Sequence, residues 1–168
     1  QAIMERLADQ IAPAVENARL YQERGAGTEE RAVVDEVAHI VTSTLDIDQV
    51  YEKFAAEVKK LVDFDRLALT LANRDAAVLV PNYVSGVLLE GEEIQPSMPL
   101  AGSITGWVIQ TGRALLRADI NVVDGFWNDP ARLRAGLRSS LAVPLRSKDT
   151  ITGMLQVLSC RASAYGSR

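Results

Sequence analysis

The pattern of hydrophobic and polar positions predicts two neighbouring strands near the end of the chain, Ser139–Leu145 and Ile151–Ser159. In the first run Leu141, Val143 and Leu145 occupy alternate positions, which is the period of a strand with one buried face, and the second run is rich in strand-forming residues. The residues between them, Arg146–Thr150, are polar and predict a turn. Gly153 inside the second run indicates a bulge or the close approach of another backbone. A hairpin this apolar on one face must be covered, so we expect it to lie within a larger antiparallel sheet.

Further strands of the same sheet are predicted upstream. Leucines alternate with smaller residues over Arg66–Ala72, and Asn73-Arg74-Asp75 forms the turn to a second strand over Ala77–Tyr83, which Pro81 interrupts. Short strands are expected at Ser97–Leu100 and Ala114–Ala118.

Residues 1–24 have the apolar spacing of a long amphipathic helix. Steps of three and four residues define a seam of the coiled-coil type that predicts a homodimer contact. Its members are Met4, Leu7, Ile11, Ala14, Ala18 and Tyr21. Gly25-Ala26-Gly27 ends this helix, and so short a connection favours continuing straight, or exchange between protomers, over folding back. We therefore divide the chain into a linker or signalling helix at 1–27 and a domain at 28–168.

Two more helices are expected before the first strand of the sheet, and a short one after it. Thr28 is a good N-cap for the first, and Asp46 or Asp48 caps the next. Gly102-Ser103 opens the short helix Ile104–Gln110, which Gly112 closes. Residues 119–137 have no clear period and hold Phe126 and Trp127, so we expect a long binding loop that packs against the domain.

Composition and charge narrow the class of protein. The 168 residues are 48% hydrophobic and 24% charged, as in a soluble domain with an appendage, and no apolar run approaches the roughly 20 residues of a membrane span. No signal peptide is visible, although the chain begins at Gln1, and the single Cys160 fits a reducing compartment. We expect a cytoplasmic protein without membrane contact through this segment.

The charge is uneven along the chain. The net charge is −4, yet from Pro130 onward seven basic residues face one acid, Asp149. This excess indicates either a solvated basic loop or an anion site. Nucleic-acid binding would require aromatic residues interleaved with these basic residues, and only Tyr165 is present. No nucleic-acid partner is therefore expected.

Two segments carry a family resemblance. LAGSITGWVIQTGRALLRADI and GLRSSLAVPLRSKDTITGMLQVLS resemble the second half of a GAF domain, and STLDIDQVYEKFAAEVKKLVDFDRLAL resembles its first helices and strand. Residues 1–24 resemble the closing helix of a preceding module in bacterial multidomain sensor proteins of the histidine kinase type. The matching positions of the second half are Gly102, Gly106, Trp107, Val108, Gly112, Asp119, Ser139, Val143, Pro144, Leu145, Gly153, Leu155 and Ser159.

The resemblance implies an α+β fold of the GAF type, which is related to the PAS fold. It consists of a six-stranded antiparallel sheet with helices on one face and a ligand pocket on the other. The short helix and the 119–137 loop would roof that pocket. The closing helix that the family places after the last strand is not seen in the sequence.

Several GAF ligands require residues that this sequence lacks. Asn73-Arg74 is not followed by the pattern that accompanies cyclic nucleotides. Haem would need an axial ligand, and the single His39 lies within a predicted helix. Cys160 lies outside the usual bilin attachment segments, and one cysteine is too few for methionine sulfoxide reduction. We therefore expect no cofactor, no metal site and no enzyme activity.

Non-covalent sensing of an unidentified small molecule remains, with relay through dimeric helices to an effector domain such as a histidine kinase, in a two-component system. A ligand-free relay is the alternative, since the tryptophans could fill the pocket themselves. A partly anionic ligand near Arg138 and Trp107 would account for the basic excess. The candidate ligand-binding residues are Tyr83, Ile104, Trp107, Val108, Phe126, Trp127, Arg138, Ser139 and Gln156.

Overall fold

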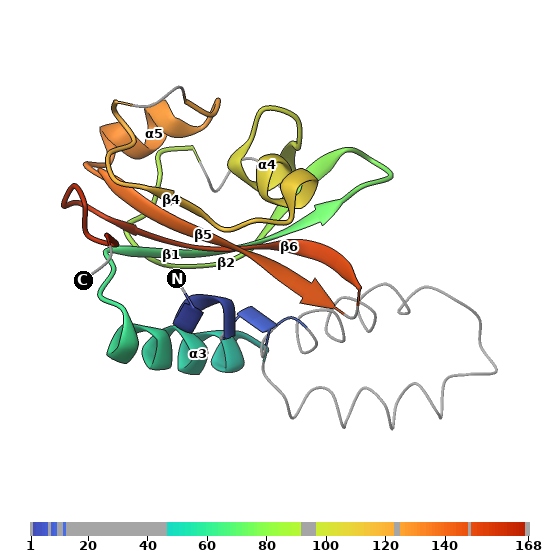
Figure 1. Ribbon diagram of the computed structural model, residues 1–168, viewed down its shortest axis with the longest axis horizontal. Helices are drawn as coiled ribbons and strands as arrows, with labels where there is room; N and C mark the ends of the chain where they lie inside the picture. Colours follow the sequence, from blue (N-terminus) through green and yellow to red (C-terminus); the bar gives the residue numbers. More distant parts are fainter. Residues whose placement is uncertain are drawn as a thin grey trace.

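A single antiparallel sheet organises the protein. The computed structural model describes residues 2–6, 8, 9, 12, 47–91, 97–122, 125–147 and 149–166. Six strands form the sheet in the order β3-β2-β1-β6-β5-β4, and all neighbours are antiparallel (Figure 1). The predicted α+β fold and its six-stranded sheet are therefore confirmed. The strands are β1 (Arg66–Asn73), β2 (Val78–Gly86), β3 (Met98–Pro99), β4 (Leu115–Arg117), β5 (Ser139–Ser147) and β6 (Thr150–Ser159).

Helices cover both faces of the sheet. The helix α3 (Ile47–Leu61) and the helical residues 2–6, 8, 9 and 12 lie on one face. The helices α4 (Ile104–Thr111) and α5 (Asp129–Arg134) lie on the other (Figure 1).

The main hydrophobic core lies between α3 and the sheet. The three alternate leucines of β1 and the odd-numbered apolar residues of β5 and β6 point into it, as their period predicts. The N-terminal residues Met4, Ala8 and Ala12 are buried in the same core, at intervals of one helical turn. These described N-terminal residues therefore pack against the core of their own chain, whereas the sequence favoured a straight continuation or exchange between protomers.

Gly153 is required by the packing of β6 against β1. A Cβ at this position would clash with the carbonyl oxygen of Thr70. The close backbone approach predicted from the sequence is confirmed. On β2, the pairing with β1 skips one residue between Pro81 and Tyr83, so the strand continues past the proline through a bulge.

The roof over the second face combines one predicted helix with one that was not predicted. The hydroxyl of Ser103 accepts a hydrogen bond from the N–H of Gly106 at 2.9 Å and begins α4, and Gly112 ends it with φ of 65°. Residues 119–137 were expected to be a loop throughout, but they contain α5, with Pro130 in its first turn. Six residues are too few to show a helical period, and the proline at the first turn was the available signal.

Candidate functional site

The pleat of β1, β6, β5 and β4 places a row of polar residues on the face beneath α4 and α5. Arg66 of β1 pairs with Leu158 of β6, which pairs with Ser140 of β5. Ser140 in turn pairs with Arg117 of β4. Residues paired directly across antiparallel strands share one face, so two arginines and a serine flank a single leucine here. All three polar side chains are buried.

The adjacent row on the same face holds Gln156 between two short side chains. Gln156 of β6 pairs with Ala68 on one side and with Ala142 on the other. The glutamine is 1% exposed. Because each neighbour is only a methyl group, no long side chain flanks the amide along this row.

A buried carboxylate joins two arginines above these rows. Asp129 of α5 accepts hydrogen bonds from Nη1 of Arg117 at 2.8 Å and from Nη1 of Arg132 at 3.2 Å. Its other oxygen accepts the backbone N–H of Phe126 at 2.8 Å. Arg132 also donates to the side-chain oxygens of Asn128 and, at 3.0 Å, of Gln156. We call Arg117, Asp129, Arg132, Gln156 and Ser140 the buried polar cluster.

Three polar atoms of this cluster make no hydrogen bond although they are buried. They are Nε of Arg132, Nε2 of Gln156 and Oγ of Ser140. The identity of the free atom of Gln156 follows from its neighbour: Arg132 can only donate, so the amide must turn its oxygen toward the guanidinium and its NH₂ group away. Buried polar atoms without partners are uncommon and costly, so the presence of three in one cluster marks a candidate binding site.

Ionisation within the cluster follows from burial and from opposite charges. Burial opposes the charge of Asp129, but hydrogen bonds from Arg117 and Phe126 and the charges of both arginines outweigh it and lower the pKa of the carboxyl group. Burial, only partly offset by Asp129, lowers the pKa of Arg132 to about 10, with Arg66 and Arg117 adding to the effect. Both groups are therefore charged at neutral pH.

Apolar side chains lie beside the cluster under α4. Ile104 and Val108 are buried against Ala142 and Met154, and Trp107 and Phe126 are partly buried against them. The guanidinium of Arg117 lies 5.2 Å from the centre of the Phe126 ring, a cation–π contact. Within the roof, the backbone N–H of Trp127 donates a hydrogen bond to the carbonyl oxygen of Gly102 at 3.2 Å.

Of the nine residues that the sequence proposed for ligand binding, the structure brings five together here. Gln156 lies in the polar cluster, and four hydrophobic residues lie beside it, namely Ile104, Trp107, Val108 and Phe126. Trp127 is in the roof but 42% exposed.

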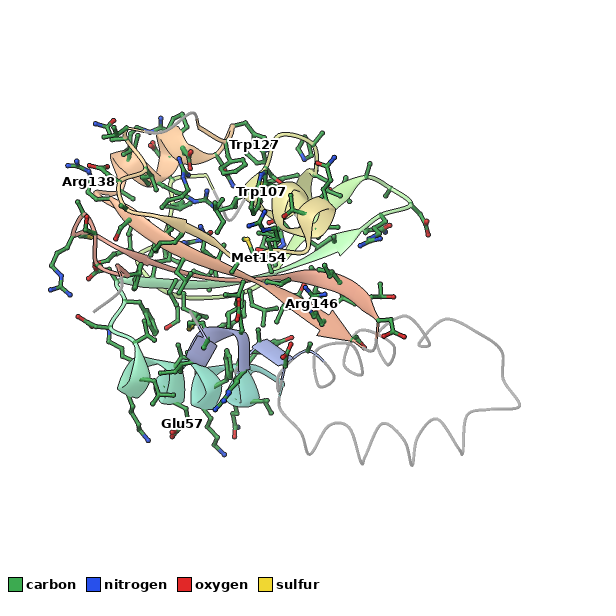
Figure 2. All side chains as sticks on the ribbon, viewed as in Figure 1. Glu57, Trp107, Trp127, Arg138, Arg146 and Met154 are labelled. Atoms are coloured by element: carbon green, nitrogen blue, oxygen red, sulfur yellow. The ribbon has the colours of Figure 1, made fainter. Side chains whose placement is uncertain are left out.

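The other three lie elsewhere. Tyr83 lies on the opposite face of the sheet, where its ring stacks on Tyr51 of α3 at 5.2 Å between centroids. Ser139 also belongs to the opposite pleat from Ser140, and its hydroxyl donates to the backbone oxygen of Arg161. Arg138 pairs with Asp119, is partly exposed and lies well away from Trp107 (Figure 2).

Four members of the cluster were missed by the sequence analysis. Ser140 could have been found from the strand period, because it alternates with Leu141 and Val143, which point into the main core. Arg117 lies on β4, which has three residues and is too short to show a period. Asp129 and Arg132 could not be found in this way either, because their placement depends on α5. The basic excess after Pro130 was the only sequence signal for Arg132, and it directed attention to Arg138 instead.

The predicted dimer residues are mostly outside the described part of the chain. Met4 is buried against the core of its own chain, and nothing is described for the side chains of Leu7, Ile11, Ala14, Ala18 and Tyr21. His39 likewise lies outside the described residues. Cys160 is exposed at the end of β6, where partial desolvation of the sulfur and the charge of Asp65 raise the pKa of its thiol.

Neither a metal site nor a membrane-spanning helix is found among the described residues. No group of three or more histidine, cysteine, aspartate or glutamate residues among them could hold a metal ion. Within the same part of the chain, no helix is long and apolar enough to cross a membrane.

Comparison with solved structures identifies similar folds at low sequence identity. The GAF domain of a two-component sensor histidine kinase from Bacillus halodurans is 20% identical, with a TM-score of 0.60, 69% of this chain covered and 78% of that one. NreA from Staphylococcus aureus, mutated in its nitrate binding site, is 22% identical, with a TM-score of 0.59 and coverage of 71% and 91%. The free methionine-R-sulfoxide reductase of Neisseria meningitidis, in complex with its substrate, is 18% identical, with a TM-score of 0.56 and coverage of 82% and 80%.

The family itself is established from the sequence profile. A search of curated proteins gave no match. The profile of the GAF domain matches residues 46–167, which include all six strands of the sheet and the helices α3, α4 and α5. The chain therefore belongs to the GAF domain family.

Proposed function

We propose that this GAF domain is a sensory module that binds a small molecule non-covalently between the sheet and its α4–α5 roof. The observation that carries the proposal is the presence of three buried, unpartnered polar atoms in one cluster beneath that roof. Apolar walls with a few convergent polar groups are typical of small-molecule sites. Two proteins of similar fold hold small molecules: NreA has a nitrate binding site, and the free methionine-R-sulfoxide reductase was solved in complex with its substrate. Both support a ligand-binding role.

The output of the module passes through its helical layer. The strands that carry the cluster on one face carry the core residues under α3 and the N-terminal helix on the other. A ligand that shifts β5 or β6 therefore bears directly on the packing of those helices. We propose that the protein acts as a homodimer through these helices and regulates an effector domain in the same chain, of the histidine kinase type, in the cytoplasm.

A thermal-shift screen of small metabolites tests the binding step. A ligand present at about 100 times its Kd stabilises a protein by about 2.7 kcal/mol. For a chain of this size that corresponds to a rise in Tm of about 5–10 °C. A hit should also increase amide protection in α4 and α5 in hydrogen exchange. If a broad screen finds no stabilising compound, the binding proposal is wrong.

The relay step has its own test. Light scattering should give a dimer for the unmutated protein and a lower mass for Leu7→Asp/Ile11→Asp, because the substitutions place charge on the predicted seam. A monomer in the unmutated protein would contradict relay through a dimer.

A ligand-free relay is the alternative, and one observation favours it. Trp107 and Phe126 already pack against the buried residues under α4 and fill part of that face. The screen distinguishes the two functions, since a relay without ligand gives no stabilising compound and still forms the dimer. We do not propose an enzyme of the sulfoxide reductase type, because Cys160 is the single cysteine of the sequence and its raised pKa disfavours the reactive thiolate.

A further inference from the structure

We propose that the buried polar cluster binds a small monovalent oxyanion, such as a short carboxylate or a nitrate-like ion, through Arg132, Gln156 and Ser140. This inference rests on the proposed function, because it names the class of ligand that the same site takes.

The free atoms of the cluster specify the hydrogen-bonding character of the ligand. The N–H of Arg132 Nε and the NH₂ of Gln156 can only donate, and the hydroxyl of Ser140 can also donate. Three donors without partners require a ligand that accepts. A neutral ligand with its own donors would leave at least some of these groups unpaired.

The charges of the cluster indicate the sign of the charge on the ligand. Among the described residues, the guanidinium groups of Arg117 and Arg132 share the one carboxylate of Asp129. Arg66 is not included in this count. All three side chains are nearly fully buried, with exposures of 4% for Arg117, 6% for Arg132 and 3% for Asp129. A buried charge without a counter-charge is strongly unfavourable, so one further negative charge would complete the cluster.

The side chains that neighbour Gln156 indicate the size of the ligand. Gln156 is flanked on the sheet by the methyl groups of Ala68 and Ala142, so a group of a few heavy atoms is the kind of ligand that can lie against its amide. Ser140 is one diagonal step away on β5, on the same face. A guanidinium N–H, an amide NH₂ and a hydroxyl within one cluster are donors of the kind that an oxyanion accepts.

The test is a thermal-shift and calorimetric titration of the whole chain with sodium nitrate, formate, acetate and bicarbonate. Each is compared with sodium chloride at equal ionic strength, because salt alone screens surface charges. At least one oxyanion should raise Tm in a saturable way that chloride does not reproduce. No oxyanion-specific shift would overturn the inference.

Gln156→Glu is the decisive variant, because it supplies the missing negative charge from the protein itself. We expect it to raise Tm without added anion at neutral pH, and to weaken oxyanion binding by at least about tenfold, since it replaces donors by a charged acceptor. The same substitution at the exposed Gln110 of α4 is the matched control and should change neither property. A lower Tm for Gln156→Glu would show that the cluster is already neutral and would overturn the inference.

Ser140→Ala gives a second measurement that does not change the charge. It should weaken binding severalfold while the protein stays folded. Oxyanion binding that neither variant weakens would lie elsewhere and would overturn the inference. A neutral compound that stabilises the protein, with no response to oxyanions, would leave the sensory function standing and remove only the oxyanion.

Discussion

Asp129→Asn should destabilise the protein by about 3 kcal/mol, because Asp129 is the carboxylate that holds α5 to the sheet. The side chain accepts hydrogen bonds from Arg117, Arg132 and the backbone of Phe126. Removing one partner of a buried charged pair costs roughly 3–5 kcal/mol. Asparagine retains one acceptor oxygen, so the lower end of this range applies. At about 2–4 °C per kcal/mol, Tm should fall by about 6–12 °C.

The pH dependence of this effect follows from the lowered pKa of Asp129. A carboxyl group with a pKa lower in the folded state than in the unfolded state adds stability above its unfolded pKa of about 3.9. That contribution is lost as the pH falls through the lower, folded-state pKa. The difference between the two proteins should therefore be largest near neutral pH and shrink on acidification.

Urea unfolding followed by tryptophan fluorescence measures both effects. The control is Asp75→Asn in the exposed β1–β2 turn, which should change the free energy of unfolding by less than about 0.5 kcal/mol. A loss of less than about 1 kcal/mol for Asp129→Asn, or a loss that does not change with pH, would refute the reasoning about the buried ion pair.

Three further predictions concern the rest of the fold. Met4→Ala should lower the free energy of unfolding in urea by about 2–5 kcal/mol, because Met4 is fully buried. Ile3→Ala, at an exposed position, should be nearly neutral. Equal effects would contradict the packing of these N-terminal residues within their own chain. Gly153→Ala should destabilise by about 1–3 kcal/mol in the same assay, since its Cβ would meet Thr70, and Gly166→Ala, with its nearest atom at 3.8 Å, should not. Asp65 accepts hydrogen bonds from the N–H of Cys160 and the hydroxyl of Ser159, which lower its pKa, so an NMR titration should find it below about 3.9; an ordinary value would contradict these contacts.

The sheet could be predicted from the sequence because alternation along β1 and β5 reports directly which side of a strand is buried. The register also follows, since a shift by one residue would expose every leucine of β1. The roof was harder: α4 has Ser103 and Gly112 as recognisable caps, whereas α5 has only Pro130.

The polar cluster was only partly predictable for a related reason. Gln156 could be assigned from its place in β6, but its partners come from β4, β5 and α5, which are distant in sequence. The choice of Arg138 over Arg132 shows this limit. Both are arginines in the same basic stretch, and only the tertiary structure gives one of them Asp119 on the surface and the other Asp129 in the interior.

The central claim, that the cluster recognises a small oxyanion, is tested most directly by NMR of its own donor groups. Titration with the best oxyanion from the thermal-shift series should move the Nε–H signal of Arg132 and the NH₂ signals of Gln156 together. Both should saturate at the same Kd, while the NH₂ signals of Gln110 stay in place. If the two cluster signals do not respond, or shift only as much as they do with sodium chloride, the claim is wrong.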